Sequence, residues 1–136
     1  MLPFFLLLLV QRAPAAPAPS VDRPCSFVTA AEMSTLLGTP VTISDEHFRC
    51  KYVSGQGWLQ VEVLNFELRG TRDIFDYDKA HGKAVSGIGD QAYLFGAAIV
   101  SKVGDVVIAV DGNNLPRKAT DQQLKTIALK IAHAIP

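Results

Sequence analysis

The chain has 136 residues, a length that suits one domain, and 49% of them are hydrophobic while 19% are charged. Thirteen Lys and Arg residues balance thirteen Asp and Glu residues, so the formal net charge is zero. A chain without a basic excess cannot neutralise many phosphates, which argues against nucleic acid as a partner.

The first 18 residues predict a secretory signal peptide. Leu2 to Val10 form a short apolar run, and small residues of the A-x-A type follow over 13–18. Signal peptides have about 7–15 apolar residues before such a site, whereas a membrane-spanning helix needs about 18 or more. No Lys or Arg precedes the apolar run, which departs from the usual pattern. We expect a protein that is secreted or held in the cell envelope or periplasm, with no membrane span in the mature chain.

The two cysteines, Cys25 and Cys50, predict one disulfide in the single domain expected over residues 25–136. An even cysteine count in an exported protein indicates pairing, and two cysteines allow one intramolecular connection. Closing a loop of about 25 residues would stabilise the fold by roughly 3–3.5 kcal/mol. Two free thiols are the alternative. Residues 19–24 are expected to form an extended leader, and the charged, rigid residues 21–24 argue against Cys25 as a lipidation site.

The first helix is predicted over about residues 29–37. Thr29 and Glu32 form a capping box, and Gly38 supplies a left-handed stop that Pro40 reinforces.

Two strands are predicted next, over residues 47–53 and 58–68, and they should form an antiparallel hairpin. Alternation in the first strand places Phe48, Cys50 and Tyr52 on one side. Cys50 would then face inward, so the disulfide would join the start of the first helix to this strand. An additional short strand near residues 40–43 is an open alternative.

The second half repeats the plan of a helix followed by a hairpin. Residues 71–81 predict a weaker helix with Thr71 as a possible cap, and residues 91–95 a short strand. Residues 98–103 and 106–111 form a hairpin turned by Gly104 and Asp105. This turn pairs Ile99, Ser101 and Val103 with Val110, Ile108 and Val106 as the core face. The other face carries Val100, Lys102, Val107 and Ala109, so it is either partly covered or open to a partner.

A last helix begins at a second capping box formed by Thr120 and Gln123. Apolar residues then recur at helical spacing, which predicts docking on the sheet. A membrane-surface helix is disfavoured because the opposite face is only modestly basic. The order α-β-β-α-β-β-β-α predicts an α+β domain whose mainly antiparallel sheet carries the helices packed on one face.

A glycine-rich segment, Gly87 to Ala92, matches the pattern G-x-G-x-x-A, and Asp111 lies about 20 residues further on. A dinucleotide site would need a helix after this segment, but the strand-like residues Tyr93-Leu94-Phe95 follow instead. We therefore interpret it as a turn that starts a strand, with Asp90 accepting hydrogen bonds from nearby backbone N–H groups. Asp90 and Tyr93 are the candidate turn or site residues.

No catalytic, cofactor-binding or metal-binding residue is predicted elsewhere. The histidines His47, His81 and His133 are dispersed, without the spacing of metal ligands. Asp73, Asp76 and Asp78 lack the glycine of a calcium loop, so a solvated helix face is the better interpretation.

Several segments together resemble a known group of proteins. They are Pro24-Cys25-Ser26-Phe27-Val28-Thr29-Ala30-Ala31-Glu32, Leu37-Gly38-Thr39-Pro40-Val41, Cys50-Lys51-Tyr52, Gly87-Ile88-Gly89-Asp90-Gln91-Ala92-Tyr93 and Lys102-Val103-Gly104-Asp105-Val106-Val107. The chain resembles small exported bacterial domains of uncharacterised function, many of them lipoproteins, found notably in actinobacteria. This resemblance implies a cell-envelope location, a disulfide and an α+β fold, but no activity. The chain departs from the group because it lacks a lipid-attachment cysteine.

The sequence thus predicts an exported cell-envelope domain that is a binding or interaction module rather than an enzyme, and that needs no cofactor. Its partner would be an envelope protein or another envelope component. One alternative is a carrier of a small hydrophobic ligand held between sheet and helices. Another is a hydrolase that uses Asp90 with Tyr93 or His81.

Overall fold

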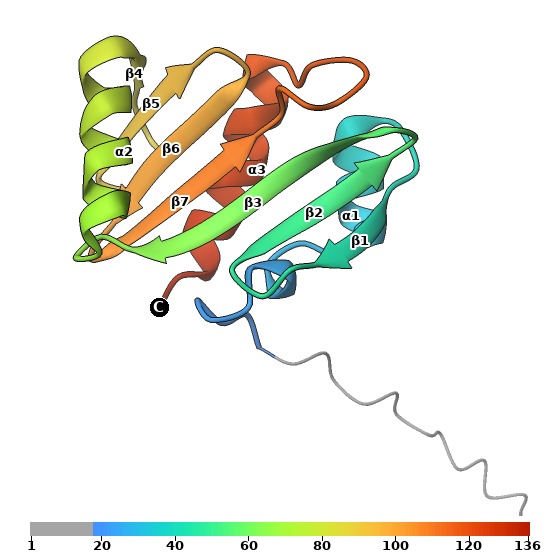
Figure 1. The fold of residues 1–136 in the computed structure, drawn as a ribbon, viewed down its shortest axis with the longest axis horizontal. Coiled ribbons are helices and arrows are strands. Elements are labelled where there is room, and N and C mark those ends of the chain that lie inside the picture. Colours follow the sequence, from blue (N-terminus) through green and yellow to red (C-terminus); the bar gives the residue numbers. More distant parts are fainter. Residues whose placement is uncertain (1–17) are drawn as a thin grey trace, which may run out of the picture.

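A computed structural model describes residues 18–136, the side chain of Arg69 excepted, and shows an α+β domain (Figure 1). The strands are β1 (Thr42–Asp45), β2 (Arg49–Ser54), β3 (Gly57–Asn65), β4 (Lys83–Val85), β5 (Gln91–Phe95), β6 (Ala98–Val103) and β7 (Val106–Asp111). The helical segments are the 3-10 turn η1 (Pro24–Ser26), α1 (Ala30–Leu37), α2 (Arg69–His81) and α3 (Asp121–Ala134). The strands form one antiparallel sheet in the order β1-β2-β3-β7-β6-β5-β4, which confirms the predicted fold class. The predicted signal peptide lies, except for its last residue, outside the described residues.

The centre of the sheet is the pairing of β3 with β7, which joins the two halves of the chain. Val61 lies opposite Val110, and Val63 lies opposite Ile108. The hairpin of β6 and β7 has the predicted register, with Ile99 opposite Val110. Alternation along these strands therefore turns their buried aliphatic side chains to one common face.

Helices α1 and α3 cover that face and enclose the main core; α3 lies behind the sheet in Figure 1. Leu124, Ile127 and Ile131 of α3 are fully buried. Both predicted capping boxes are present at the starts of α1 and α3. Lys130 of α3 forms an ion pair with Glu32 of α1. That contact is the main reason why the pKa of Glu32 lies below its ordinary value.

Helix α2 lies on the opposite face, so the prediction that the helices pack on one face is wrong for this element. Phe75 of α2 is 3% exposed and packs on Val100 and Val107 of the sheet. Phe66, Tyr93 and Ala109 border this second cluster. Removing the aliphatic side chains on this face of β6 and β7 from water is favourable, and the Phe75 ring shields them from solvent. The sequence predicted that the outward face of the second hairpin is either partly covered or open to a partner. In the structure, α2 covers part of this face.

Local differences from the predicted elements have simple causes. Phe48, predicted to face inward, is 81% exposed because β2 begins only at Arg49, two residues after the predicted start, and follows a turn in which His47 has a φ of 65°. Thr71 is not a cap: α2 begins two residues earlier, and Thr71 is buried within it. The segment predicted as an extended leader contains a turn, in which the Arg23 N–H donates to the Ser20 carbonyl (2.9 Å).

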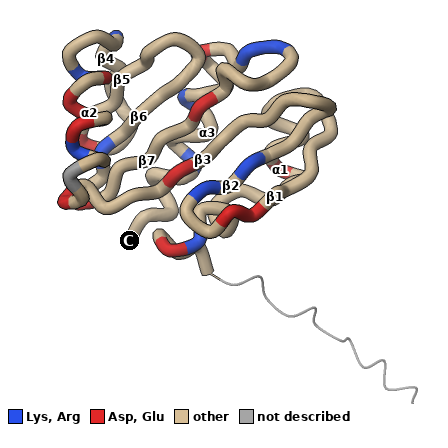
Figure 2. The backbone as a smooth tube through the Cα atoms, viewed as in Figure 1, with Lys and Arg blue, Asp and Glu red and all other residues tan. Residues whose placement is uncertain are grey.

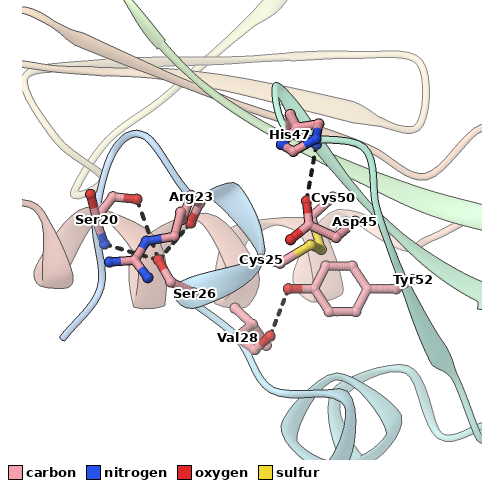
Figure 3. The surroundings of a disulfide bond; sticks show 9 residues. All are labelled: Ser20, Arg23, Cys25, Ser26, Val28, Asp45, His47, Cys50 and Tyr52. Carbon is pink, nitrogen blue, oxygen red and sulfur yellow. Dashed lines mark hydrogen bonds between the residues drawn. A yellow bond between two sulfur atoms is a disulfide. The ribbon is translucent and has the colours of Figure 1, made fainter. Parts of the chain in front are cut away.

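The predicted disulfide joins Cys25 at η1 to Cys50 on β2, with the two Cα atoms 5.0 Å apart (Figure 3). Two residues further along β2, the fully buried Tyr52 donates its hydroxyl proton to the Val28 carbonyl over 2.6 Å. Burial raises the pKa of this hydroxyl above its ordinary value. A covalent and a polar bond thus hold the segment before α1 against the same strand.

Reducing the disulfide should lower the free energy of unfolding by roughly 3–3.5 kcal/mol, because the unfolded chain regains the freedom that the closed loop of about 25 residues removes. Urea unfolding of the same protein with and without a reductant measures the difference and leaves the rest of the side-chain packing unchanged. Equal unfolding midpoints in the two conditions would contradict a stabilising role for the bond.

Tyr52→Phe should lower the free energy of unfolding by about 1–3 kcal/mol, because the buried Val28 carbonyl would lose its donor. Tyr93→Phe is the matched control. Its hydroxyl donates to Gln91 Oε1 over 3.1 Å at a half-buried site, where water can replace it, so we expect a loss below about 1 kcal/mol. Urea denaturation measures the loss in the free energy of unfolding for each variant. A larger loss for Tyr93→Phe than for Tyr52→Phe would contradict the prediction.

Candidate functional site

A groove with a cavity of about 180 Å³ lies between α2 and the sheet face that α2 partly covers, and we call it the α2–sheet groove. Apolar side chains form most of its floor: Leu64, Ala98, Val100, Val107 and Ala109. Helix α2 contributes Thr71, Ile74 and Asp78 to the opposite wall. Gln60, Glu62 and Asp111 of the sheet complete the polar part of the lining. The groove therefore combines an apolar floor with carboxylates from the sheet and from the helix.

Small residues on two central strands keep this groove open. Ala109 lies between Glu62 and Val100, its cross-strand partners on β3 and β6. Ala98 lies opposite Asp111. Because successive side chains of a strand point to opposite faces, both alanines point away from the main core and toward α2. Larger side chains at these positions would fill the space under Ile74, whose side chain is 55% exposed at the rim.

Two of the three carboxylates of the groove accept hydrogen bonds from neighbouring residues, and the third, that of Asp78, is partly buried. Glu62 Oε1 accepts from the Gln60 amide over 2.5 Å. Asp111 Oδ1 accepts from the backbone N–H and the side-chain amide of Asn113, each over 2.9 Å. Burial raises the pKa of Asp78 above its ordinary value, and the neighbouring His81 opposes this shift. A negative charge on Asp78 is thus held partly away from water.

No Lys or Arg that the structure describes forms a salt bridge with these carboxylates. On the same face of the sheet, Lys102 of β6 lies opposite Val107, with its Nζ 4.7 Å from the centre of the Phe66 ring, and β2 carries Arg49 and Lys51. Figure 2 shows acidic positions on β3, β7 and α2. Arg49 is the cross-strand partner of Glu62, but its Nε lies 3.7 Å from the Glu46 carboxylate. Lys51 pairs with the same carboxylate at 3.2 Å. The basic side chains of β2 are therefore engaged at the β1–β2 turn.

Asp90 has the turn role that its sequence context indicates. Its Oδ2 accepts from the Gly104 N–H over 2.8 Å, and its own N–H donates to the Lys102 carbonyl over 2.7 Å. Gly89 before it has a φ of 59°, and a side chain there would come within 2.6 Å of the Lys102 carbonyl oxygen. Strand β5 follows directly. The glycine-rich segment thus ties the start of β5 to the turn between β6 and β7.

The structure does not bring the candidate residues Asp90, Tyr93 and His81 together. Tyr93 bonds to Gln91, and its ring packs edge-on against Phe75 with centroids 5.8 Å apart. The His81 ring stacks on Tyr77 at 4.1 Å, and its Nδ1 lies 2.9 Å from the Tyr77 carbonyl. Within residues 18–136, no hydrogen bond joins any two of the three side chains.

In the described part of the chain, no group of three or more His, Cys, Asp or Glu side chains is placed to hold a metal ion. Among the helices of residues 18–136, none has the length and apolar character needed to cross a bilayer.

Sequence reasoning missed the α2–sheet groove because its residues come from four elements. The sequence predicts Asp78 on a solvated helix face. It singles out Asp111 only as the acidic residue that follows the glycine-rich segment in a dinucleotide-binding pattern, an interpretation set aside above. The available signal was the outward face of the second hairpin, where Val100, Val107 and Ala109 alternate with core residues. The same alternation places Glu62 on the outward face of its strand. Which helix lies over these residues does not follow from either pattern.

Comparisons with protein-family models, curated proteins and solved structures find no match to the chain.

Asp78→Asn should raise the free energy of unfolding at pH 7 by up to about 0.5 kcal/mol, a modest gain because the side chain is only partly buried. The pKa of Asp78 is raised in the folded state, so ionisation there opposes folding. The gain should therefore be present above the folded pKa and vanish below the unfolded value of about 3.9. Thermal unfolding between pH 3 and pH 7 measures it. The exposed Asp76→Asn is the control, and an equal pH dependence in both variants would exclude a special environment for Asp78.

Proposed function

We propose that the chain is an exported, non-enzymatic binding domain of the cell envelope, and that the α2–sheet groove holds part of its partner. The observation that carries this proposal is the groove itself, in which an apolar floor meets carboxylates from both walls. Binding sites commonly have this form, because apolar surface gives affinity while a few polar groups fix orientation.

The size of the groove favours an interaction module over a carrier of a small hydrophobic ligand. Pockets that bury a whole drug-sized ligand have volumes of about 300–1,000 Å³, whereas this cavity measures about 180 Å³. It can take one side chain or one end of a larger molecule. The remainder of such a partner would lie over the neighbouring sheet surface.

The contacts of the candidate catalytic residues favour binding over hydrolysis. Asp90 accepts from Gly104, and Tyr93 donates to Gln91. A general base must reach the proton that it removes, within about 2.6–3.2 Å or through one water molecule. A carboxylate already used to hold the β6–β7 turn is poorly suited to that role.

Export and an envelope location are supported by the apolar N-terminal run, by the resemblance to exported bacterial domains and by the disulfide. Disulfides persist in oxidising compartments such as the periplasm and the extracellular space. An envelope protein or another envelope component is therefore the partner we propose.

A photoreactive amino acid at Ile74, at the rim of the groove, should give a discrete crosslinked product in intact cells of the native host. The same amino acid at Tyr77 is the matched control, because Tyr77 is similarly exposed on α2 (52%) but does not line the groove. Mass spectrometry of the products identifies the species captured at each position.

Ala109→Phe should fill the floor of the groove and abolish the crosslink from position 74, while the melting temperature changes little. The proposal fails if positions 74 and 77 give the same products, or if the crosslink from position 74 is unaffected by Ala109→Phe.

A further inference from the structure

We infer that the α2–sheet groove takes a lysine or arginine side chain that a partner protein presents beside an apolar residue. This inference rests on the proposed function and specifies the chemistry that the groove recognises. It follows from three properties of the groove: the sign of its charge, the apolar character of its floor, and its size.

The charge of the groove is negative on both walls. Its lining includes three carboxylates and no Lys, Arg or His. On the sheet, Glu62 lies opposite Ala109 and Asp111 lies opposite Gln60, so Glu62 and Asp111 are diagonal neighbours, with Cβ atoms closer than about 8 Å. Asp78 faces the same space from α2. A cation between helix and sheet would therefore have carboxylates on two sides.

The floor of the groove distinguishes a basic side chain from a simple ion. Val100 and Val107 are each less than 5% exposed and line the space below the carboxylates, together with Ala109. An apolar floor supplies no oxygen ligands to a metal ion. Lys and Arg instead pack an aliphatic stem along apolar surface while the charged end reaches a polar group. The arrangement in the groove matches both parts of such a side chain.

The size and surroundings of the groove favour a protein segment as the source of this side chain. The cavity of about 180 Å³ takes a single side chain, so the affinity of a whole partner must come from further contacts. Next to the groove, β2 presents Arg49 and Lys51, and β3 presents Trp58, with the Lys51 ammonium 4.6 Å from the Trp58 ring centre. Protein–protein interfaces usually have an apolar centre, a polar rim and an enrichment in aromatic residues and arginine.

Titration with short blocked peptides tests the inference on the purified exported protein. The probes are hexapeptides with a central Arg or Lys between leucines, and matched peptides with citrulline or norleucine at the same position. Methyl NMR signals of Val100, Val107 and Ile74 report on the groove. We expect saturable shifts with the Arg and Lys peptides, at least tenfold weaker binding with citrulline or norleucine, and weaker binding at higher salt, because charge attraction is screened.

A second test removes the negative charges of the groove by substitution. The combined variant Glu62→Gln, Asp78→Asn, Asp111→Asn should weaken binding of the Arg peptide at least tenfold, whereas Asp76→Asn, on the same helix but outside the groove, should leave it unchanged. Circular dichroism verifies that the combined variant is folded, and single substitutions replace it if it is not. Equal binding to both proteins would overturn the inference.

The outcomes separate this inference from the proposed function. If position 74 crosslinks to a discrete partner but the basic and neutral peptides bind equally well, the ligand class is wrong and the binding site stands. If vesicles of phosphatidylethanolamine move the same methyl signals and the peptides do not, the cation belongs to a lipid headgroup, and the assignment to a protein is overturned. If neither crosslinks nor shifts occur, both proposals fail.

Discussion

The pairing of β3 with β7 is the constraint on which the rest of the structure depends. It is the contact between the two hairpins at the centre of the sheet, and it fixes which residues of β3 share a face with those of β7. A shift by one residue would exchange the two faces of either strand. Val61 and Val63 would then leave the main core, and Glu62 would enter it without a partner. The register in which β3 pairs with β7 therefore determines both the main core and the α2–sheet groove.

Helix α2 explains why the second face of the sheet has a groove rather than a second full core. The helix is rich in charged residues, and within its described side chains Phe75 is the large apolar residue that is buried against the sheet. The Phe75 ring covers Val100 and Val107, whereas Ala98 and Ala109 beside them are only partly buried and line the groove. The polar composition of α2 thus leaves apolar sheet surface beside Asp78 and Ile74.

Features encoded by neighbouring residues could be predicted from the sequence. The capping boxes, the Gly104-Asp105 turn and the register of Ile99 with Val110 each depend on a few consecutive residues. The disulfide followed from the number of cysteines in a chain expected to be exported. The position of α2 could not be predicted, because it depends on which sheet face lacked cover once β3 and β7 had paired. The groove was missed for the same reason, since Glu62, Asp78 and Asp111 come together only in the folded sheet.

The distribution of stabilising contacts fits a domain in which one part is held firmly and another accepts a partner. Near η1 and β2, the disulfide and the Tyr52–Val28 hydrogen bond tie the chain together; Val28, Cys50 and Tyr52 are fully buried, and Cys25 is partly buried. Around α2, by contrast, Asp78 carries a charge that burial disfavours, and Ile74 remains half exposed. Neither feature stabilises the isolated domain. A partner that brings a cation and apolar surface would improve the environment of both residues at once, so these local costs are consistent with a binding role for the α2–sheet groove.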